Sequence, residues 1–182
     1  MLSKVIAPYV KPSTFFYEYA PRKIDIRVVF LAACVLGSVP LLRIGLGNLL
    51  GILPGKFFEE YAVIFAFSLW QKPAQVLPQQ VLLLPVYMLG LFVYGGALHI
   101  LLWLAQGVRA SYPATLRCLC VAVPCMYLTV LPYSGTVAAV IYCSMFLGYS
   151  LKATHMTRWS RVLPVLAVNV PVLFLVCRIL FP

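Results

Sequence analysis

The sequence predicts an all-α integral membrane protein, built as a single bundle of five transmembrane helices. Three observations predict this class: an excess of apolar residues, apolar stretches of bilayer length, and an uneven distribution of basic residues. Of the 182 residues, 63% are apolar and only 10% are charged, and the mean hydropathy is +0.99. A soluble domain is typically about 45–50% apolar and about 25% charged. Hydrocarbon, rather than water, must therefore cover most of this surface.

Five stretches are long and apolar enough to be spans, because a helix needs about 20 mainly apolar residues to cross about 30 Å of hydrocarbon. They lie at about 25–42, 81–106, 113–131, 135–151 and 162–180. We expect residues 1–24 to form a cytoplasmic tail and residues 25–182 to form one transmembrane domain. Pro85, Pro124 and Pro164 fall inside spans and predict kinks there.

The connection between the first two spans holds a further apolar segment, Phe57 to Trp70, which begins with Glu59 and Glu60. Its uninterrupted apolar run is about ten residues, which suits an interfacial or re-entrant helix better than a span. Before it, residues 45–51 hold three glycines. Glycine destabilises a helix interior, so we expect the first helix to end before this stretch.

The basic residues select the orientation of the bundle, since Lys and Arg favour cytoplasmic loops. With five spans and a cytoplasmic N-terminus, ten basic residues lie inside and four lie outside. The four outer residues are Arg43, Lys56, Lys72 and Arg178. Counting residues 57–70 as a sixth span gives seven on each side. The sequence therefore predicts five spans, with the N-terminus in the cytoplasm and the C-terminus outside.

Several classes of function are disfavoured by what the sequence contains. The basic residues are scattered singly between apolar runs, rather than forming the continuous basic face that nucleic-acid binding requires. The six cysteines all lie in apolar stretches without a C-x-x-C pair, which is typical of small buried hydrophobes. The chain has no metalloprotease, nucleophile-elbow or phosphate-loop motif. We expect a protein that is not an enzyme and needs no metal or cofactor.

Two polar residues fall inside predicted spans and are candidate intramembrane contacts. His99 lies near the inner end of the second span beside Gly95 and Gly96, where it can hydrogen-bond across a close helix crossing. Asn169 lies midway along the fifth span next to Pro171, and an amide in lipid must find a partner. For both residues a structural hydrogen bond is the first interpretation. The alternative is a proton, ligand or substrate pathway.

A third candidate feature is a set of basic residues on the predicted cytoplasmic side. They are Arg109, Arg117, Lys152, Arg158 and Arg161, together with His155. The simpler interpretation is that they contact the anionic headgroups of membrane lipids. The other is that they form a docking surface for an acidic cytoplasmic partner. The sequence leaves both open.

Several short motifs, spread over residues 92–166 and at the N-terminus, resemble those of the Yip-domain family of polytopic membrane proteins. They are Gly95–Leu102 (GGALHILL), the break at Gln106-Gly107, Ala114–Arg117 (ATLR), Pro124, the turn Pro132–Gly135 (PYSG), Leu151–His155 (LKATH) followed by Arg161 and Pro164, and the start Pro12–Phe16. One departure is Gln106, where the family usually has a paired glycine. The resemblance implies a five-span bundle with a cytoplasmic N-terminus and no catalytic residues. Eukaryotic relatives are associated with Rab GTPases, vesicle formation and membrane shaping, whereas the short tail here is typical of a bacterial inner-membrane protein.

These observations favour a non-catalytic scaffold, assembly factor or accessory subunit of a membrane complex, with a protein partner or a second copy of itself. The alternative is a transporter or lipid-handling protein with a path through the bundle near His99, Asn169 and Pro171. Five spans do not divide into the inverted repeats common in transporters, which favours the first hypothesis.

Overall fold

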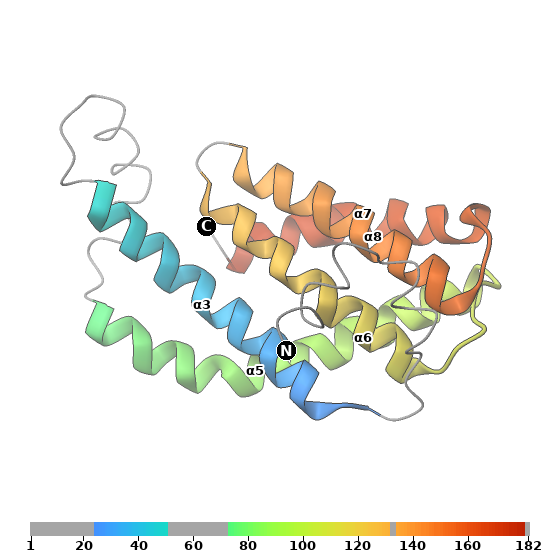
Figure 1. Ribbon diagram of the computed structural model, residues 1–182, viewed down its shortest axis with the longest axis horizontal. Helices are drawn as coiled ribbons and strands as arrows, with labels where there is room; N and C mark the ends of the chain where they lie inside the picture. The colour runs from blue at the N-terminus through green and yellow to red at the C-terminus, as the bar shows by residue number, and fades with distance from the viewer. Residues whose placement is uncertain (1–23, 51–72, 132–133, 181–182) are drawn as a thin grey trace, which may run out of the picture.

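The computed structural model describes residues 24–50, 73–131 and 134–180, and in these ranges all the regular secondary structure is helical. The elements are α3 (Ile26–Leu50), α5 (Pro73–Leu104), α6 (Tyr112–Ala122), the 3₁₀ helix η1 (Val123–Val130), α7 (Gly135–His155) and α8 (Trp159–Leu180) (Figure 1). Five helical stretches are long and apolar enough to cross a membrane, with α6 and η1 forming one of them. The predicted number of spans is thus confirmed for the described residues. The predicted tail and the segment 57–70 lie outside them.

The first span is longer than the sequence indicates. We expected it to end near residue 42, but α3 continues through Pro40 and Gly45 to Leu50. The expectation that the glycines stop this helix before residue 45 was wrong. In hydrocarbon, an unpaired backbone group costs several kcal/mol, whereas a helical glycine costs about 1 kcal/mol. The helical backbone is therefore retained.

The prolines act differently at different sites. Pro85 and Pro164 lie inside unbroken α-helices, whereas the α-helical part of the third span ends just before Pro124. From Val123 to Val130 the chain is a 3₁₀ helix, which is long for this type. Proline lacks an N–H and crowds the carbonyl four residues earlier. The kink expected at Pro124 is therefore observed as a change from α-helix to 3₁₀ helix.

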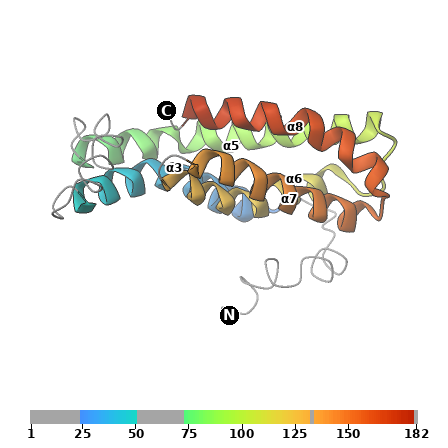
Figure 2. The same cartoon turned by 90° about the horizontal axis from the view of Figure 1, so that it is seen from above.

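The helices form two layers. Figure 2 shows α5 and α8 side by side in one layer, and α3, α6 and α7 in the other. The core lies between the layers, and its largest side chains are almost fully buried leucines. These are Leu98, Leu102, Leu116, Leu147 and Leu151. The outward face of α5 is apolar and exposed, as expected of a helix in contact with lipid: Leu82 is 77% exposed and Val93 65% exposed.

Glycines allow close contact at two helix crossings. A Cβ placed on Gly95 of α5 would lie 2.9 Å from a methyl group of Leu116 on α6. A Cβ on Gly148 of α7 would lie 2.7 Å from a methyl group of Leu166 on α8. Small residues bring helix backbones together in membranes, where packing replaces the hydrophobic effect as the driving force. These two crossings fix α5 on α6 and α7 on α8.

One end of the bundle, which we call the basic end, is where α5 and α7 finish and α6 and α8 begin. Both α5 and α7 finish there in a left-handed residue, Gln106 (φ 53°) and Met156 (φ 47°). The N–H of Gly107 then bonds to the carbonyl of Leu102, and that of Thr157 to the carbonyl of Lys152. This is the Schellman arrangement, which pairs the last carbonyls of a helix. It makes the chain turn sharply at the end of α5 and again at the end of α7.

Candidate functional site

The polar residues of the basic end converge on His155, the last residue of α7. Its ring is completely buried, with 0% of its surface exposed. The ring Nδ1 lies 3.2 Å from the backbone nitrogen of Arg109 and 3.1 Å from that of Ala110. Both of these groups are donors, so Nδ1 is the acceptor and carries no proton. The His155 ring thereby holds the loop between α5 and α6 onto the end of α7.

The absence of a proton on Nδ1 of His155 fixes the direction of the remaining hydrogen bonds. A neutral ring without a proton on Nδ1 carries it on Nε2, and Nε2 lies 2.9 Å from Oγ1 of Thr115 on α6. The Thr115 hydroxyl accepts this bond and donates its own proton to Nδ1 of His99 on α5, 2.8 Å away. We call His155, Thr115 and His99 the relay. It links three helices by a chain of bonds that all run in one direction.

Three further contacts extend the relay into the helix packing. The Tyr112 hydroxyl donates to the backbone carbonyl of Phe92 on α5, at 2.8 Å, and its ring meets the His99 ring edge-on at 5.9 Å between centroids. On the other side, Sγ of Cys118 lies 3.2 Å from Oγ1 of Thr154. The first turns of α6 are thus bonded to both α5 and α7.

Arg161, in the first turns of α8, joins the fourth helix to this arrangement. Its Nη1 donates to the backbone carbonyl of Gln106, at 2.6 Å. The left-handed turn at Gln106 leaves this carbonyl available as an acceptor. The side chains of His155 and Arg161 therefore both hold the loop of residues 105–111. The loop of residues 156–158 is held by backbone bonds, from Thr157 to Lys152 and from Arg161 to Arg158.

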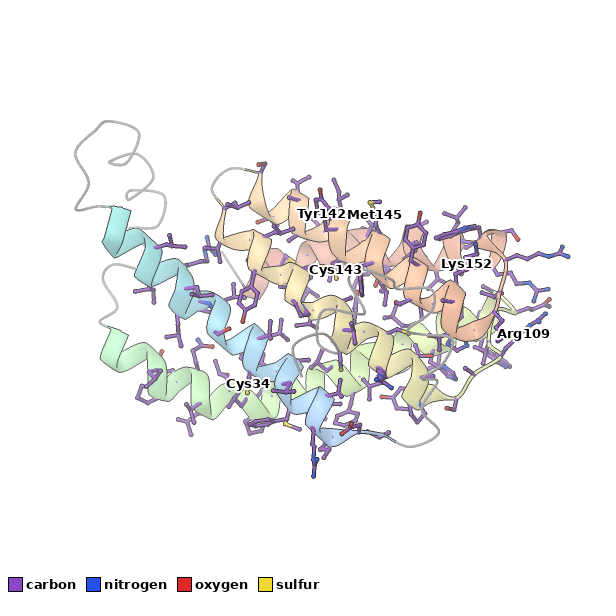
Figure 3. The ribbon with its side chains drawn as sticks, in the orientation of Figure 1. Cys34, Arg109, Tyr142, Cys143, Met145 and Lys152 are labelled. Atoms are coloured by element: carbon purple, nitrogen blue, oxygen red, sulfur yellow. The ribbon has the colours of Figure 1, made fainter. Side chains whose placement is uncertain are left out.

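The six residues predicted to form a cytoplasmic surface have different roles in the structure. The side chains of His155 and Arg161 bond to the loop between α5 and α6, and Lys152 places its ammonium 5.0 Å from the centre of the Trp159 ring. Arg117 is half-buried on α6. Arg109 and Arg158 are exposed, and Figure 3 shows Arg109 pointing away from the end of the bundle. These two arginines are the part of the predicted set most accessible to a partner.

Asn169 is the second candidate, and the structure places it apart from the relay. It is 2% exposed, and its Oδ1 accepts a hydrogen bond from the hydroxyl of Tyr94 on α5. Its amide nitrogen has no partner among the described residues. Asn169 lies ten residues after Trp159, about 15 Å along α8. The pair therefore joins α5 to α8 near the middle of the bilayer.

Thr115 and Tyr94 are the partners that the sequence did not single out as site residues. Thr115 lies within the ATLR motif, but a threonine near the start of a helix is ordinary. Tyr94 gives no signal, because aromatic residues are common throughout the chain. The described part of the chain contains no group of three His, Cys, Asp or Glu side chains that could hold a metal. The cysteines, all of which are described, are free thiols.

Comparisons with protein-family models, with curated proteins and with solved structures found no match. The resemblance to the Yip-domain family therefore rests on the sequence motifs alone.

Proposed function

We propose that this chain is a non-catalytic membrane protein that acts as a scaffold, assembly factor or accessory subunit of a membrane complex. Its basic end is the docking surface, and the partner is an acidic cytoplasmic segment of another protein. The observation that carries the proposal is the fixed geometry of the two loops that present Arg109 and Arg158. Side chains bond the first loop, and backbone bonds hold the second. A surface that is already ordered loses less entropy on binding.

The orientation that goes with this proposal has the N-terminus in the cytoplasm and the C-terminus outside. The clustering of Arg109, Lys152, Arg158 and Arg161 at one end of the bundle supports it. In this orientation, residues 57–70 form an interfacial or re-entrant segment on the outer side. The membrane is the bacterial inner membrane, and the family is that of the Yip-domain proteins; both rest on the resemblance described above.

Anionic lipid headgroups are the competing occupant of the same surface, and one experiment separates the two. Arg109→Gln/Arg158→Gln removes the two exposed guanidiniums of the loops at the basic end, while keeping the predicted excess of inner positive charge. Arg27→Gln is the control, since Arg27 is an exposed arginine at the start of α3. Each variant is extracted gently from its source membrane, and the co-purifying proteins and lipids are identified by mass spectrometry.

The proposal expects one stoichiometric protein partner, whose recovery falls roughly tenfold in the double variant, a loss of about 1.4 kcal/mol. The Arg27→Gln control should retain it. If no protein co-purifies and all variants retain anionic lipid in proportion to their charge, the docking proposal is wrong. Arg161 is left intact because its bond to Gln106 makes its loss a structural change.

Transport along a polar path has less support than docking. His99 bonds to Thr115 and Asn169 to Tyr94, so the two residues belong to separate contacts. A cavity lies between the two layers of the bundle, and neither residue is among the described residues that line it. That cavity is apolar, and it favours lipid binding over the passage of a polar solute.

A further inference from the structure

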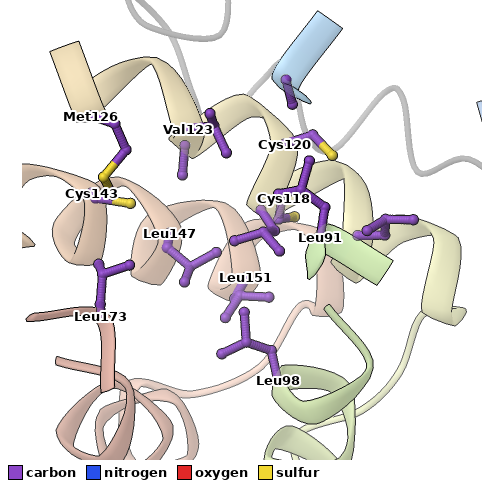
Figure 4. Close-up of a cluster of buried hydrophobic side chains, with 14 of the residues drawn as sticks. Leu91, Leu98, Cys118, Cys120, Val123, Met126, Cys143, Leu147, Leu151 and Leu173 are labelled. Atoms are coloured by element: carbon purple, nitrogen blue, oxygen red, sulfur yellow. The ribbon is translucent and has the colours of Figure 1, made fainter. Parts of the chain in front are cut away.

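A cavity of about 360 Å³ lies between the two layers of the bundle. Its wall on α5 is formed by residues spaced along one face: Leu83, Val86, Tyr87, Gly90, Leu91 and Tyr94. The opposite wall comes from the other helices, and Figure 4 shows three of its residues, Met126, Cys143 and Leu173, gathered from η1, α7 and α8. The cavity is therefore a feature of the packing of the whole bundle.

The hydrogen bond between Tyr94 and Asn169 marks one limit of the cavity. The cavity residues of α5 lie before Tyr94, and those of α8, namely Leu173, Val176 and Cys177, lie after Asn169. Helices α5 and α8 are therefore bonded to each other near the bilayer centre. From that point the cavity separates them in the direction away from the basic end. On the α5 side the cavity reaches the surface, since Val86 is 58% exposed.

Gly90 accounts for the hollow in α5. A Cβ placed on Gly90 meets no atom within 4 Å, although the side chains one turn away on either side line the cavity. Any larger side chain at this position would extend into the space. The cavity thus exists because a glycine stands at the centre of this face.

Water is a poor occupant of this space. A buried water molecule needs two to four polar partners, and the hydroxyls on the wall are already engaged. Tyr94 donates to Asn169, and Tyr87 donates to Oε1 of Gln80 at 2.9 Å. The five apolar helices place the opening in hydrocarbon, so the surrounding medium offers lipid chains instead.

The dimensions of the cavity match one lipid chain. From Leu83 to Tyr94 is eleven residues of helix, or about 16 Å, and one leaflet contributes about 15 Å of hydrocarbon. The volume of about 360 Å³ is many times what a single water molecule needs. The Gln80–Tyr87 pair lies on α5 at the headgroup end, where its amide N–H groups can meet an ester carbonyl.

We propose that this cavity binds one acyl chain of a phospholipid from the leaflet opposite the basic end, with Gly90 providing the space. The bound chain fills the gap between α5 and α8 and so completes the core of that half of the bundle. The proposal does not depend on the docking function of the basic end.

The test uses the full-length protein in phosphatidylcholine vesicles that contain a phosphatidylcholine with a photoactivatable diazirine in the middle of one acyl chain. After illumination, the labelled residues are mapped by mass spectrometry. The informative positions are Met126, Cys143 and Cys177, which line the cavity and are at most 4% exposed. Lipid on the outer surface cannot reach them. Leu82 and Leu89, at 77% and 64% exposed, report the surface lipid.

We expect the three buried positions to be labelled in the parent protein, and labelling to fall at least fivefold in Gly90→Leu. The matched control is Gly96→Leu, which adds the same side chain to the same helix. A Cβ on Gly96 also meets nothing within 4 Å, and Gly96 does not line the cavity. Labelling of the buried positions should be unchanged in this control.

Val86→Trp is the second filling variant and decides the question if Gly90→Leu fails to fold. Equal labelling of Leu82 and Leu89 in all variants shows that the fold and the surface lipid are retained. The proposal is overturned if the buried positions are unlabelled in the parent. It is equally overturned if folded filling variants label them as strongly as Gly96→Leu does.

Discussion

The two ends of the bundle are held together by different kinds of contact. At the basic end, polar side chains bond α5, α6 and α7 to one another, and Arg161 of α8 bonds the loop between α5 and α6. In the other half, α5 and α8 face each other across an apolar cavity. Polar groups in hydrocarbon bond in specific directions, whereas apolar walls accept any chain that fits. The first kind of contact produces a fixed surface, and the second leaves room for a ligand.

Replacing His155 is expected to have the largest effect, because this ring is the centre of the basic end. His155→Ala leaves the N–H groups of Arg109 and Ala110 and the Thr115 hydroxyl without their partner. Unpaired buried groups cost about 1–3 kcal/mol each. We therefore expect a loss of roughly 3 kcal/mol or more in the free energy of unfolding, measured by denaturation in mixed detergent micelles.

Hydrogen exchange sharpens this prediction. In His155→Ala the amides of Arg109 and Ala110 should exchange much faster, while those in the core of α3 should not change. His155→Asn is the matched control, since its side-chain oxygen is a candidate to replace Nδ1 as the acceptor and to restore part of the protection. If the two amides remain protected in the alanine variant, the loops are held by something other than His155.

Breaking the middle of the relay should have a smaller effect. Thr115→Val keeps the shape of the side chain but removes the hydroxyl between His155 and His99. Two ring nitrogens then lose their partner, and we expect a cost of about 1–2 kcal/mol. Thr115→Ser, which retains a hydroxyl, should stay close to the parent protein in the same denaturation experiment.

The relay also predicts coupling between its ends. The cost of His99→Ala should be smaller in the Thr115→Val background than in the parent, because the shared bond is already absent. Nitrogen-15 spectra of labelled histidine should show an unprotonated Nδ1 on both rings. Additive costs, or a protonated Nδ1 on His155, would contradict the direction of bonding that we assign.

Much of the fold follows from hydropathy, because an apolar stretch of bilayer length has few alternatives to a helix. The five spans were predictable for this reason, and so was the start of the fourth span at Gly135. The course of α3 beyond Gly45 was not. Glycine propensities describe helices in water, where an unpaired backbone is solvated, and hydrocarbon removes that alternative.

The site was less predictable than the fold. His99 and Asn169 stand out because polar residues are rare in spans, but their partners Thr115 and Tyr94 are set by how the helices rotate and cross. His155 was grouped with the basic residues because of its neighbours in sequence. The Schellman turn at Met156 instead places its ring in the interior, against a loop more than forty residues away. Local patterns carry no information about such a contact.

Of the contacts considered, the hydrogen bond between Tyr94 and Asn169 should contribute least to the free energy of unfolding. Hydrogen bonds between membrane helices average about 0.6 kcal/mol, and the amide nitrogen of Asn169 has no described partner that would add to this. We expect Tyr94→Phe to cost roughly that amount. Tyr94→Phe/Asn169→Leu should be neutral or slightly stabilising, because both polar partners are then replaced by apolar groups of similar size. Denaturation of the two variants beside the parent measures this. A loss of several kcal/mol in the double variant would instead show that the pair holds α5 against α8. The contact between these two helices beside the cavity would then be as strongly bonded as the basic end.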